Sequence, residues 1–125
     1  DAKGLLLAAI ADPNPVLFLE HKYLYRAVKG EVPVGPYRTE LGKARIARSG
    51  TDATIVTYGI GVHWALEEAG WLCEQGREIE IIDLRTLIPW DREAVLASVA
   101  KTSRALSNSS PVVLPISTSI SVIAA

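Results

Sequence analysis

The fold of this chain is decided by residues 53–83, ATIVTYGIGVHWALEEAGWLCEQGREIEIID. Ala53–Tyr58 is rich in β-branched residues and ends at a glycine, which predicts a strand. Val62–Glu74 has the spacing of an amphipathic helix, and Ile79–Asp83 is a second strand candidate. Because short joints connect these segments, they predict a parallel sheet with a right-handed crossover.

The sequence that flanks this unit extends the α/β pattern. Ala44–Arg48 is a short strand candidate on one side. On the other side, Asp91–Thr102 is predicted as a helix with Asp91 as its N-cap and Glu93 near the positive end of the helix dipole. We therefore expect an α/β fold built on a parallel sheet.

The N-terminal part predicts a separate unit. Leu5–Ile10 is rich in good helix formers and is stopped by the turn Asp12-Pro13-Asn14-Pro15. Val16–Leu19 then has the composition of a buried strand. Residues 31–42 begin with a stretch rich in Gly and Pro and are predicted to be a linker, so a domain boundary is placed there.

The C-terminal part changes in character. Residues 43–106 carry the α/β pattern, whereas residues 107–125 are a Ser-rich tail of atypical composition. Within the tail, Val112–Leu114 is the one strand candidate.

The composition sets limits on the function. Apolar residues make up 49% of the 125 residues, charged residues 22%, and the net charge is −1, a balance typical of a globular domain. This composition argues against nucleic acid as a partner, and no apolar run is long enough to cross a membrane. Cys73 is the single cysteine, so no internal disulfide forms and a reducing compartment is expected. The chain has no methionine and is interpreted as a piece of a longer protein.

The predicted helix Val62–Glu74 carries two tryptophans on its polar side. Trp64 and Trp71 lie nearly opposite the apolar stripe that would face the sheet. Tryptophan is enriched at the centre of protein interfaces, which predicts a subunit contact here. The alternative is that each ring lies flat under a neighbouring loop.

Few residues suggest chemistry. Asp83 and Arg85 flank the carboxyl end of a strand, where open α/β sheets place their functional crevice, so they are candidates for fixing a loop or pairing with a partner. The alternative is a local structural pair. His21 and His63 lack a nearby nucleophile in sequence, and no catalytic residue is predicted.

A dinucleotide site is not predicted. Gly59-Ile60-Gly61 opens a helix after a strand, but the third glycine of the fingerprint falls on Trp64, which is too bulky for that position.

Seven segments in order resemble the β subunit of the decarboxylase-dehydrogenase component of 2-oxo acid dehydrogenase complexes. They span Asp1 to about Arg104, and the last resembles the branched-chain (2-oxoisovalerate) enzymes more than the pyruvate enzymes. The segments are Asp1–Leu6, Asp12–Val16, Phe18–Arg26, Gly42–Ala44, Val56–Gly59, Val62–Glu67 and Asp83–Asp91.

The resemblance implies an architecture and a reaction. Residues 1–30 would end a pyrimidine-binding α/β domain, and residues 43–106 would begin a three-layer transketolase C-terminal-type domain. The β subunit would pair with an α subunit in an α2β2 heterotetramer, with thiamine diphosphate and magnesium (Mg2+) at their interface. The dihydrolipoyl acyltransferase core would dock nearby, in the bacterial cytoplasm or the mitochondrial matrix. The reaction would decarboxylate a 2-oxo acid and transfer the acyl group to a lipoyl arm.

The resemblance also implies what this segment lacks. The family's cofactor-activating glutamate and active-site histidine would lie upstream of Asp1, so the segment alone is expected to be inactive. His21 stands where the family usually has proline, and the tail after Arg104 departs from the family pattern.

Related β subunits hold a structural potassium ion (K+), whose ligands here would be Ala9, Asp12 and Asn14. Carbonyl and carboxylate oxygens suit such a hard cation. The alternative is that this turn only stops a helix.

The sequence leaves two other interpretations of the function. One is a non-catalytic subunit-interaction module in which Trp64, Trp71 and the Asp83–Asp91 loop form a subunit interface. The other is a pyruvate dehydrogenase β subunit or a transketolase-like enzyme such as a deoxyxylulose-phosphate synthase, although Leu19–Arg26 argues against the latter enzyme.

Overall fold

The computed structural model describes residues 1–107 and 121–124. No helix within these residues has the length and apolar character needed to span a membrane. The elements in chain order are α1 (Ala2–Ala11), β1 (Val16–Leu19), α2 (Leu24–Ala27), β2 (Arg45–Arg48), β3 (Ala53–Thr57), α3 (Ile60–Glu74), β4 (Ile79–Asp83), β5 (Thr86–Ile88), α4 (Arg92–Thr102), β6 (Ala105–Ser107) and β7 (Ser121–Ala124).

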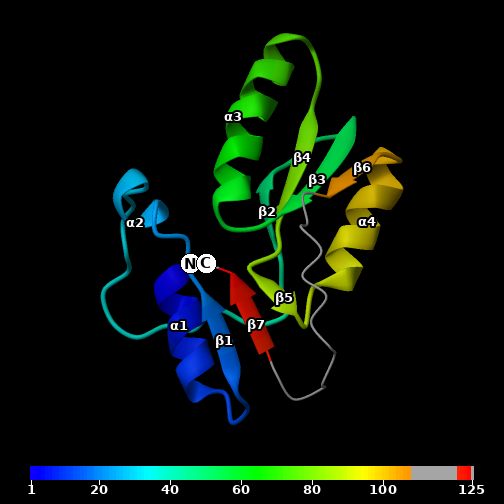
Figure 1. Ribbon diagram of the computed structural model, residues 1–125. Helices are drawn as coiled ribbons and strands as arrows, with labels where there is room; N and C mark the ends of the chain where they lie inside the picture. Colours follow the sequence, from blue (N-terminus) through cyan, green and yellow to red (C-terminus); the bar gives the residue numbers. More distant parts are fainter. Residues whose placement is uncertain (108–120, 125) are drawn as a thin grey trace.

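The larger sheet contains the predicted strand–helix–strand unit. Its strand order is β2–β4–β3–β6, and β3 pairs in parallel with both β4 and β6 (Figure 1). The predicted parallel β3–α3–β4 unit is therefore confirmed. The sheet as a whole is mixed, because the edge strand β2 runs antiparallel to β4.

The direction of β2 follows from the turn that connects it to β3. The chain reverses within a few residues after Arg48, so β2 and β3 run in opposite directions. Because β4 lies between them and is parallel to β3, β2 is antiparallel to β4. Gly50 makes this reversal fit, since a Cβ at this position would lie 2.3 Å from the carbonyl carbon of Ile79. Only glycine lets the backbone pass this close to the start of β4.

Helices cover both faces of the larger sheet, which gives three layers. On one face, Ala65 and Ala69 of α3 pack against Ile79 and Ile81 of β4 in a buried apolar cluster. The small alanine side chains allow the helix to approach the sheet closely. This face has the apolar stripe that the sequence predicts.

The opposite face, covered by α4, is polar. Thr54, Glu80, Ser98 and Thr102 are buried there. The Thr54 hydroxyl lies 2.7 Å from both the Ser98 and the Thr102 hydroxyl oxygens, and the Glu80 carboxylate accepts hydrogen bonds from Ser98 and Lys101. Side chains alternate along a strand, so Glu80 points to α4 while its neighbours Ile79 and Ile81 point to α3.

The N-cap of α4 is as predicted. Asp91 accepts a hydrogen bond from the backbone N–H of Ala94 at 3.1 Å and a second from the N–H of Ala44 at 3.1 Å. Burial alone would raise the pKa of the Asp91 carboxyl, but these two N–H donors outweigh it and hold the pKa below its ordinary value. The cap therefore joins α4 to the start of β2.

A smaller sheet joins the two ends of the described chain. Its order is β1–β7–β5, with β7 parallel to β1 and antiparallel to β5. Val122, Ile123 and Ala124 are buried in it. The Ser-rich tail thus contributes a central strand in residues 121–124, whereas the strand candidate Val112–Leu114 lies outside the described residues.

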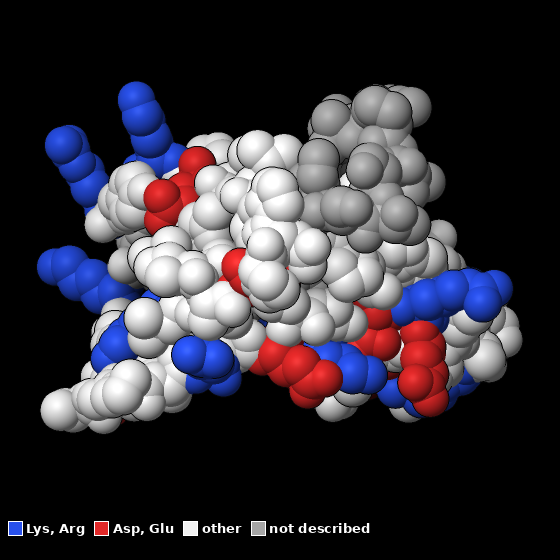
Figure 2. All heavy atoms as spheres, turned by 90° about the horizontal axis from the view of Figure 1, so that it is seen from below, with Lys and Arg blue, Asp and Glu red and all other residues white. Residues whose placement is uncertain are grey.

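The N-terminal helix α1 packs on this smaller sheet and ends before the turn that the sequence predicts as a helix stop. Leu5 is buried, but Leu6 and Ile10 are exposed, as are Leu17 and Leu19 of β1. Seen from the side on which α1 and β1 lie, the surface is largely uncharged, with most Lys and Arg side chains toward its edges (Figure 2). A helix that is apolar on most sides is usually covered on most sides, so this region has the composition of a contact surface.

Candidate functional site at the junction of the two sheets

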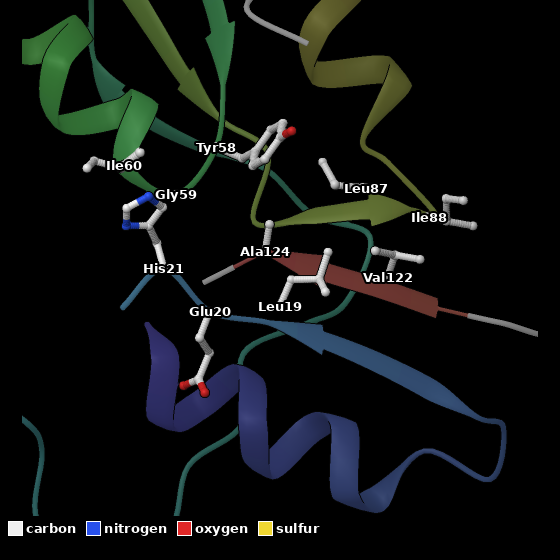
Figure 3. A pocket seen from close by; sticks show the side chains of 10 residues that line it. All are labelled: Leu19, Glu20, His21, Tyr58, Gly59, Ile60, Leu87, Ile88, Val122 and Ala124. Atoms are coloured by element: carbon white, nitrogen blue, oxygen red, sulfur yellow. The ribbon is translucent and has the colours of Figure 1, made fainter. Parts of the chain in front are cut away.

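Two neighbouring cavities lie where the smaller sheet meets the carboxyl ends of β3 and β4. The first has a volume of about 300 Å³ and is lined mainly by apolar side chains (Figure 3). Leu19, Val122 and Ala124 come from the smaller sheet, and Tyr58 and Gly59 follow β3. The cavity is thus formed by strand ends, where α/β folds usually place ligands.

The side chains of His21 and Glu20, two polar residues at this first cavity, point in different directions (Figure 3). His21 lies next to Gly59, whereas the Glu20 side chain points away from the cavity toward α1 (Figure 3). Glu20 accepts a hydrogen bond from the Tyr25 hydroxyl at 2.5 Å. This bond raises the pKa of Tyr25, because ionisation would place two negative charges side by side. Glu20 therefore lines both cavities with its carboxylate bound to the Tyr25 hydroxyl.

The second cavity, of about 600 Å³, is lined by charged residues. Asp1, Arg45, Asp83 and Arg85 lie along it. His21 and His63, the two histidines of the chain, also reach it. The sequence did not predict that these two residues come together, because one follows β1 and the other lies in the first turn of α3.

An ion-pair network forms the wall of the second cavity. The Arg45 guanidinium lies 3.0 Å from the Asp83 carboxylate and 3.3 Å from that of Asp1, and the Arg85 guanidinium lies 3.5 Å from Asp1. Asp83 and Arg85 interact through the backbone, since the Arg85 N–H donates to the Asp83 carboxylate at 3.2 Å. The charge partner of Asp83 is therefore Arg45, which sequence analysis did not identify.

The backbone of Arg85 adopts a conformation that is rare for residues other than glycine. Its φ of 56° lies in the left-handed region, which residues other than glycine seldom adopt. The guanidinium donates to the Lys43 carbonyl at 2.9 and 3.2 Å and to the Ala44 carbonyl at 3.3 Å. Burial lowers the pKa of Arg85, and the Asp83 carboxylate opposes that shift. These contacts fix Arg85 as a link between the end of β4 and the residues before β2.

The predicted interface residues fall in two separate places. Trp64 and Trp71 are 55% and 70% exposed on the outer face of α3, away from the sheet. Asp83 and Arg85 line the second cavity and make the internal contacts described above. The structure thus places the two tryptophans on one face of α3 and brings Asp83 and Arg85 into contact, but does not join the two pairs.

The predicted potassium ligands lie in one turn. The Asp12 N–H donates to the Ala9 carbonyl at 3.3 Å at the end of α1. The Asp12 carboxylate accepts hydrogen bonds from the Asn14 backbone N–H at 2.9 Å and from the Asn14 side-chain amide at 3.0 Å. The structure therefore places all three residues side by side, and the same contacts also stabilise the turn itself.

The two cavities offer binding groups but few reactive ones. The described residues that line them include no Ser, Thr, Cys or Lys. They therefore provide none of the usual side-chain nucleophiles except histidine, tyrosine and carboxylates. Tyr58 was missed by sequence analysis, although it directly follows β3, and the rule that functional residues gather at strand ends would have found it.

The sequence is similar to several characterised proteins over most of its length. It is 49% identical over 106 residues to the 2-oxoisovalerate dehydrogenase subunit beta of Bacillus subtilis (strain 168), which covers 85% of this chain and 32% of that protein. It is 52% identical over 106 residues to the pyruvate dehydrogenase E1 component subunit beta of the same strain, over 85% of this chain and 33% of that protein. It is 55% identical over 104 residues to the acetoin:2,6-dichlorophenolindophenol oxidoreductase subunit beta of Cupriavidus necator, over 83% of this chain and 30% of that protein.

A solved structure is also similar. A split-gene transketolase, described as an inactive β4 tetramer, matches with a TM-score of 0.55 and 33% identity, over 62% of this chain and 26% of that chain.

The family match covers the larger sheet and its helices. The chain spans about a third of the length of the curated relatives and is homologous to β subunits of 2-oxo acid and acetoin dehydrogenases. Residues 42–110, which include β2 through β6, match the transketolase, C-terminal domain family. Since that match takes in more than half of the 125 residues, the chain belongs to the transketolase C-terminal domain family.

Proposed function

We propose that this chain is part of the β subunit of a thiamine-diphosphate-dependent dehydrogenase that acts on a branched-chain 2-oxo acid, and that its residues contribute structure and subunit contacts rather than catalytic groups. The observation that carries the β-subunit assignment is the 49% identity to a 2-oxoisovalerate dehydrogenase subunit beta over 85% of the chain.

In this proposal the chain spans parts of two domains, and the smaller sheet takes β1 from the first and β5 from the second. Residues 1–30 end a pyrimidine-binding domain, residues 31–42 connect, and residues 43–106 begin the C-terminal domain. The intact β subunit pairs with an α subunit in an α2β2 assembly and meets the dihydrolipoyl acyltransferase core, in a bacterial cytoplasm or a mitochondrial matrix. The preference for a branched-chain substrate rests on Ile88–Asp91.

The outer face of α3 is proposed as a subunit contact. Trp64 and Trp71 are one above the other at a seven-residue spacing, and both are more than half exposed. Large exposed aromatic side chains seldom occur without a partner and are frequent at the centre of interfaces. Asp83 and Arg85 do not lie on this face of α3. They line the second cavity, and a subunit contact at that cavity would involve them.

The turn after α1 fits a potassium ion. The Ala9 carbonyl, the Asp12 carboxylate and the Asn14 amide supply oxygen atoms within one turn, and hard cations bind such oxygens. In the intact subunit these three residues would provide part of the coordination shell.

The cofactor does not fit the described residues by themselves. When bound in the intact assembly, thiamine diphosphate would supply the nucleophilic carbon needed to decarboxylate a 2-oxo acid. Within residues 1–107 and 121–124, no three His, Cys, Asp or Glu side chains form a group that could hold a metal ion. We therefore assign no reaction step to this chain.

The proposal is tested with two proteins. The 125-residue chain with added thiamine diphosphate, magnesium and 2-oxoisovalerate should release no carbon dioxide above background, whereas the complete β subunit with its α subunit should decarboxylate 2-oxoisovalerate faster than pyruvate. Turnover by the isolated chain would contradict the non-catalytic role. A complete enzyme without 2-oxo acid activity would contradict the assignment itself.

A pyruvate dehydrogenase β subunit is the second candidate. The 52% identity to the Bacillus subtilis pyruvate dehydrogenase protein supports it about as strongly as the first is supported. The same assay separates the two, since a complete enzyme that prefers pyruvate would establish the second candidate.

The proposed interface predicts the effect of a substitution in the complete β subunit. Trp71→Ala should weaken its association with partner subunits by about 2 kcal/mol, the loss typical of a buried interface tryptophan. Leu96→Ala is the control, because Leu96 is also about half exposed but lies on α4. Analytical ultracentrifugation of both variants measures the difference, and equal effects would argue against the α3 face as the contact.

A further inference from the structure

The first turn of α1 contacts two other parts of the chain. We propose that it acts as a clasp, which holds residues 28–44 against α1 and joins α1 to the C-terminal domain, and so fixes the shape of the second cavity. The residues of this clasp are Asp1, Lys3 and Gly4, and none of them belongs to the function proposed above. The inference stands independently of that function.

Lys3 binds the connecting segment by its charge. Its ammonium donates to the Pro33 carbonyl at 2.8 Å and to the Gly35 carbonyl at 2.7 Å. It also lies 5.5 Å from the centre of the Tyr37 ring, within range of a cation–π interaction. Charge-assisted hydrogen bonds are stronger than neutral ones. One side chain thus organises a Pro- and Gly-containing stretch that forms no helix or strand.

Gly4 lets the segment come into backbone contact with the helix. The Thr39 N–H donates to the Gly4 carbonyl at 3.1 Å. A Cβ on Gly4 would lie 2.3 Å from the Thr39 hydroxyl oxygen and 2.5 Å from the Tyr37 ring. Any larger residue at position 4 would therefore push Tyr37 and Thr39 away from α1.

Asp1 connects the same turn to the C-terminal domain. Its carboxylate lies 3.3 Å from the Arg45 guanidinium and 3.5 Å from that of Arg85. Arg45 in turn pairs with Asp83 at the end of β4. Asp1, Arg45 and Arg85 all line the 600 Å³ cavity. A displacement of the first turn of α1 would therefore move one wall of that cavity.

The consequence is that residues 28–44 behave as an ordered strap rather than as a loose linker. Backbone amides that are hydrogen-bonded inside a folded unit exchange slowly with solvent, and the Thr39 amide is one of them. Its exchange rate reports directly on the clasp.

Hydrogen exchange of the 125-residue chain tests the clasp. Lys3→Met keeps the length of the side chain but removes its charge, and Gly4→Ala introduces the clash. Both should speed exchange of the Thr39 amide by about tenfold and speed tryptic cleavage after the exposed Arg38. Lys29→Met and Gly70→Ala are the matched controls, because Lys29 makes no hydrogen bond or ion pair with the described residues and a Cβ on Gly70 meets nothing within 4 Å.

The result that would overturn the proposal is equal exchange at Thr39 in Lys3→Met and Lys29→Met. Lys3→Arg should restore slow exchange, because the guanidinium keeps the charge and the donors. A general loss of stability would instead speed exchange of the amides in β4 as well, so that element serves as the internal reference.

A second measurement needs no variant. Brief treatment of the folded wild-type chain with an acetylating reagent, followed by mass spectrometry, should modify Lys29 at least several times faster than Lys3. The Lys3 ammonium donates two hydrogen bonds and Lys29 donates none to the described residues, so the amine of Lys3 is less often free to react. Equal rates at the two lysines would contradict the clasp even if both Lys3 and Gly4 variants failed to fold.

Discussion

The two faces of the larger sheet are buried by different chemistry. Under α3, Ala65, Ala69, Ile79 and Ile81 form an apolar cluster. Under α4, three hydroxyl groups and the carboxylate of Glu80 form a hydrogen-bonded network. Apolar contacts have no preferred direction and depend on filled volume. Hydrogen bonds require aligned partners, and a buried polar group without one is destabilising. The α3 face should therefore respond to changes of volume, and the α4 face to changes of hydrogen bonding and of pH.

The largest effect is expected on the apolar face. Ile81→Ala should lower the free energy of unfolding by about 3 kcal/mol, because it removes buried volume from a site that is 0% exposed. Urea unfolding followed by circular dichroism measures this change. Ile46→Ala, on the edge strand β2 and 56% exposed, is the control and should change stability by about 0.5 kcal/mol or less.

The next effect tests the charge on the polar face. Glu80→Gln keeps the shape but removes the charge that Lys101, Ser98 and the Gly50 N–H bind, and should destabilise the chain by about 2 kcal/mol. Glu74→Gln makes the same chemical change at an exposed position on α3 and should have little effect. If the two variants were equally stable, the network would be a set of contacts without energetic consequence.

A smaller effect tests the hydroxyl groups alone. Thr54→Val removes the hydroxyl that lies 2.7 Å from both Ser98 and Thr102, while the volume stays nearly the same. Both partners keep other hydrogen bonds, so the expected loss is only about 1 kcal/mol. Thermal unfolding monitored against wild type would detect it. A gain in stability would show that the α4 face behaves like the apolar one.

The smallest effect is the dependence of stability on pH. Burial opposes ionisation of Glu80, but hydrogen bonds from Lys101, Ser98 and the Gly50 N–H outweigh it and hold the pKa of the carboxyl below its ordinary value. A carboxyl with a lowered pKa in the folded state binds fewer protons there than in the unfolded state. Its contribution is therefore complete above the unfolded pKa of about 4.3 and is lost as the pH falls through the folded value.

Urea unfolding between pH 6 and the acid limit of folding, roughly pH 3, measures this slope. Wild type should lose more stability than Glu80→Gln over that range. Part of the slope should remain in the variant, because the pKa of Asp91 is lowered as well. Parallel curves for the two proteins would mean that Glu80 titrates alike in the folded and unfolded states.

The sequence alone predicted those elements whose pattern depends only on residues close together in the chain. The β-branched run of β3, the spacing of α3 and the Asp91 cap of α4 each depend on residues within a few positions of one another, and the structure confirms all three. The antiparallel direction of β2 was not predicted, because it depends on the short turn at Gly50 and on the neighbour β4 further along the chain.

Elements that depend on distant partners were not predictable in this way. β7 is four residues long and follows a serine-rich stretch, so it has little local signal. It becomes a strand because β1 and β5 offer unsatisfied backbone groups on both of its sides. The burial of Glu80 also depends on a distant partner. A charged residue at the second position of a strand predicts an exposed side chain, and Glu80 is buried because α4 supplies Lys101 as its partner.

In the candidate site, too, residues with a local signal were predicted and residues that depend on distant partners were not. Asp83 was identified because functional residues gather at the carboxyl ends of parallel strands, and it does line a cavity. Arg45 and Asp1 were missed because ion pairing between residues so far apart in sequence leaves no periodic signal. The position of a charge partner is a property of the packed fold rather than of any single segment.

The central position of β7 also determines when this chain can finish folding during its synthesis. A ribosome makes β1 and β5 well before β7, and Val16 must wait for Ser121, most of the chain away, before the smaller sheet closes. Until then the apolar side chains of β1 have no strand beside them, and pairing over such long loops is slow. The nascent protein therefore spends its synthesis with an open sheet edge, which is the period in which a chaperone would be expected to bind it.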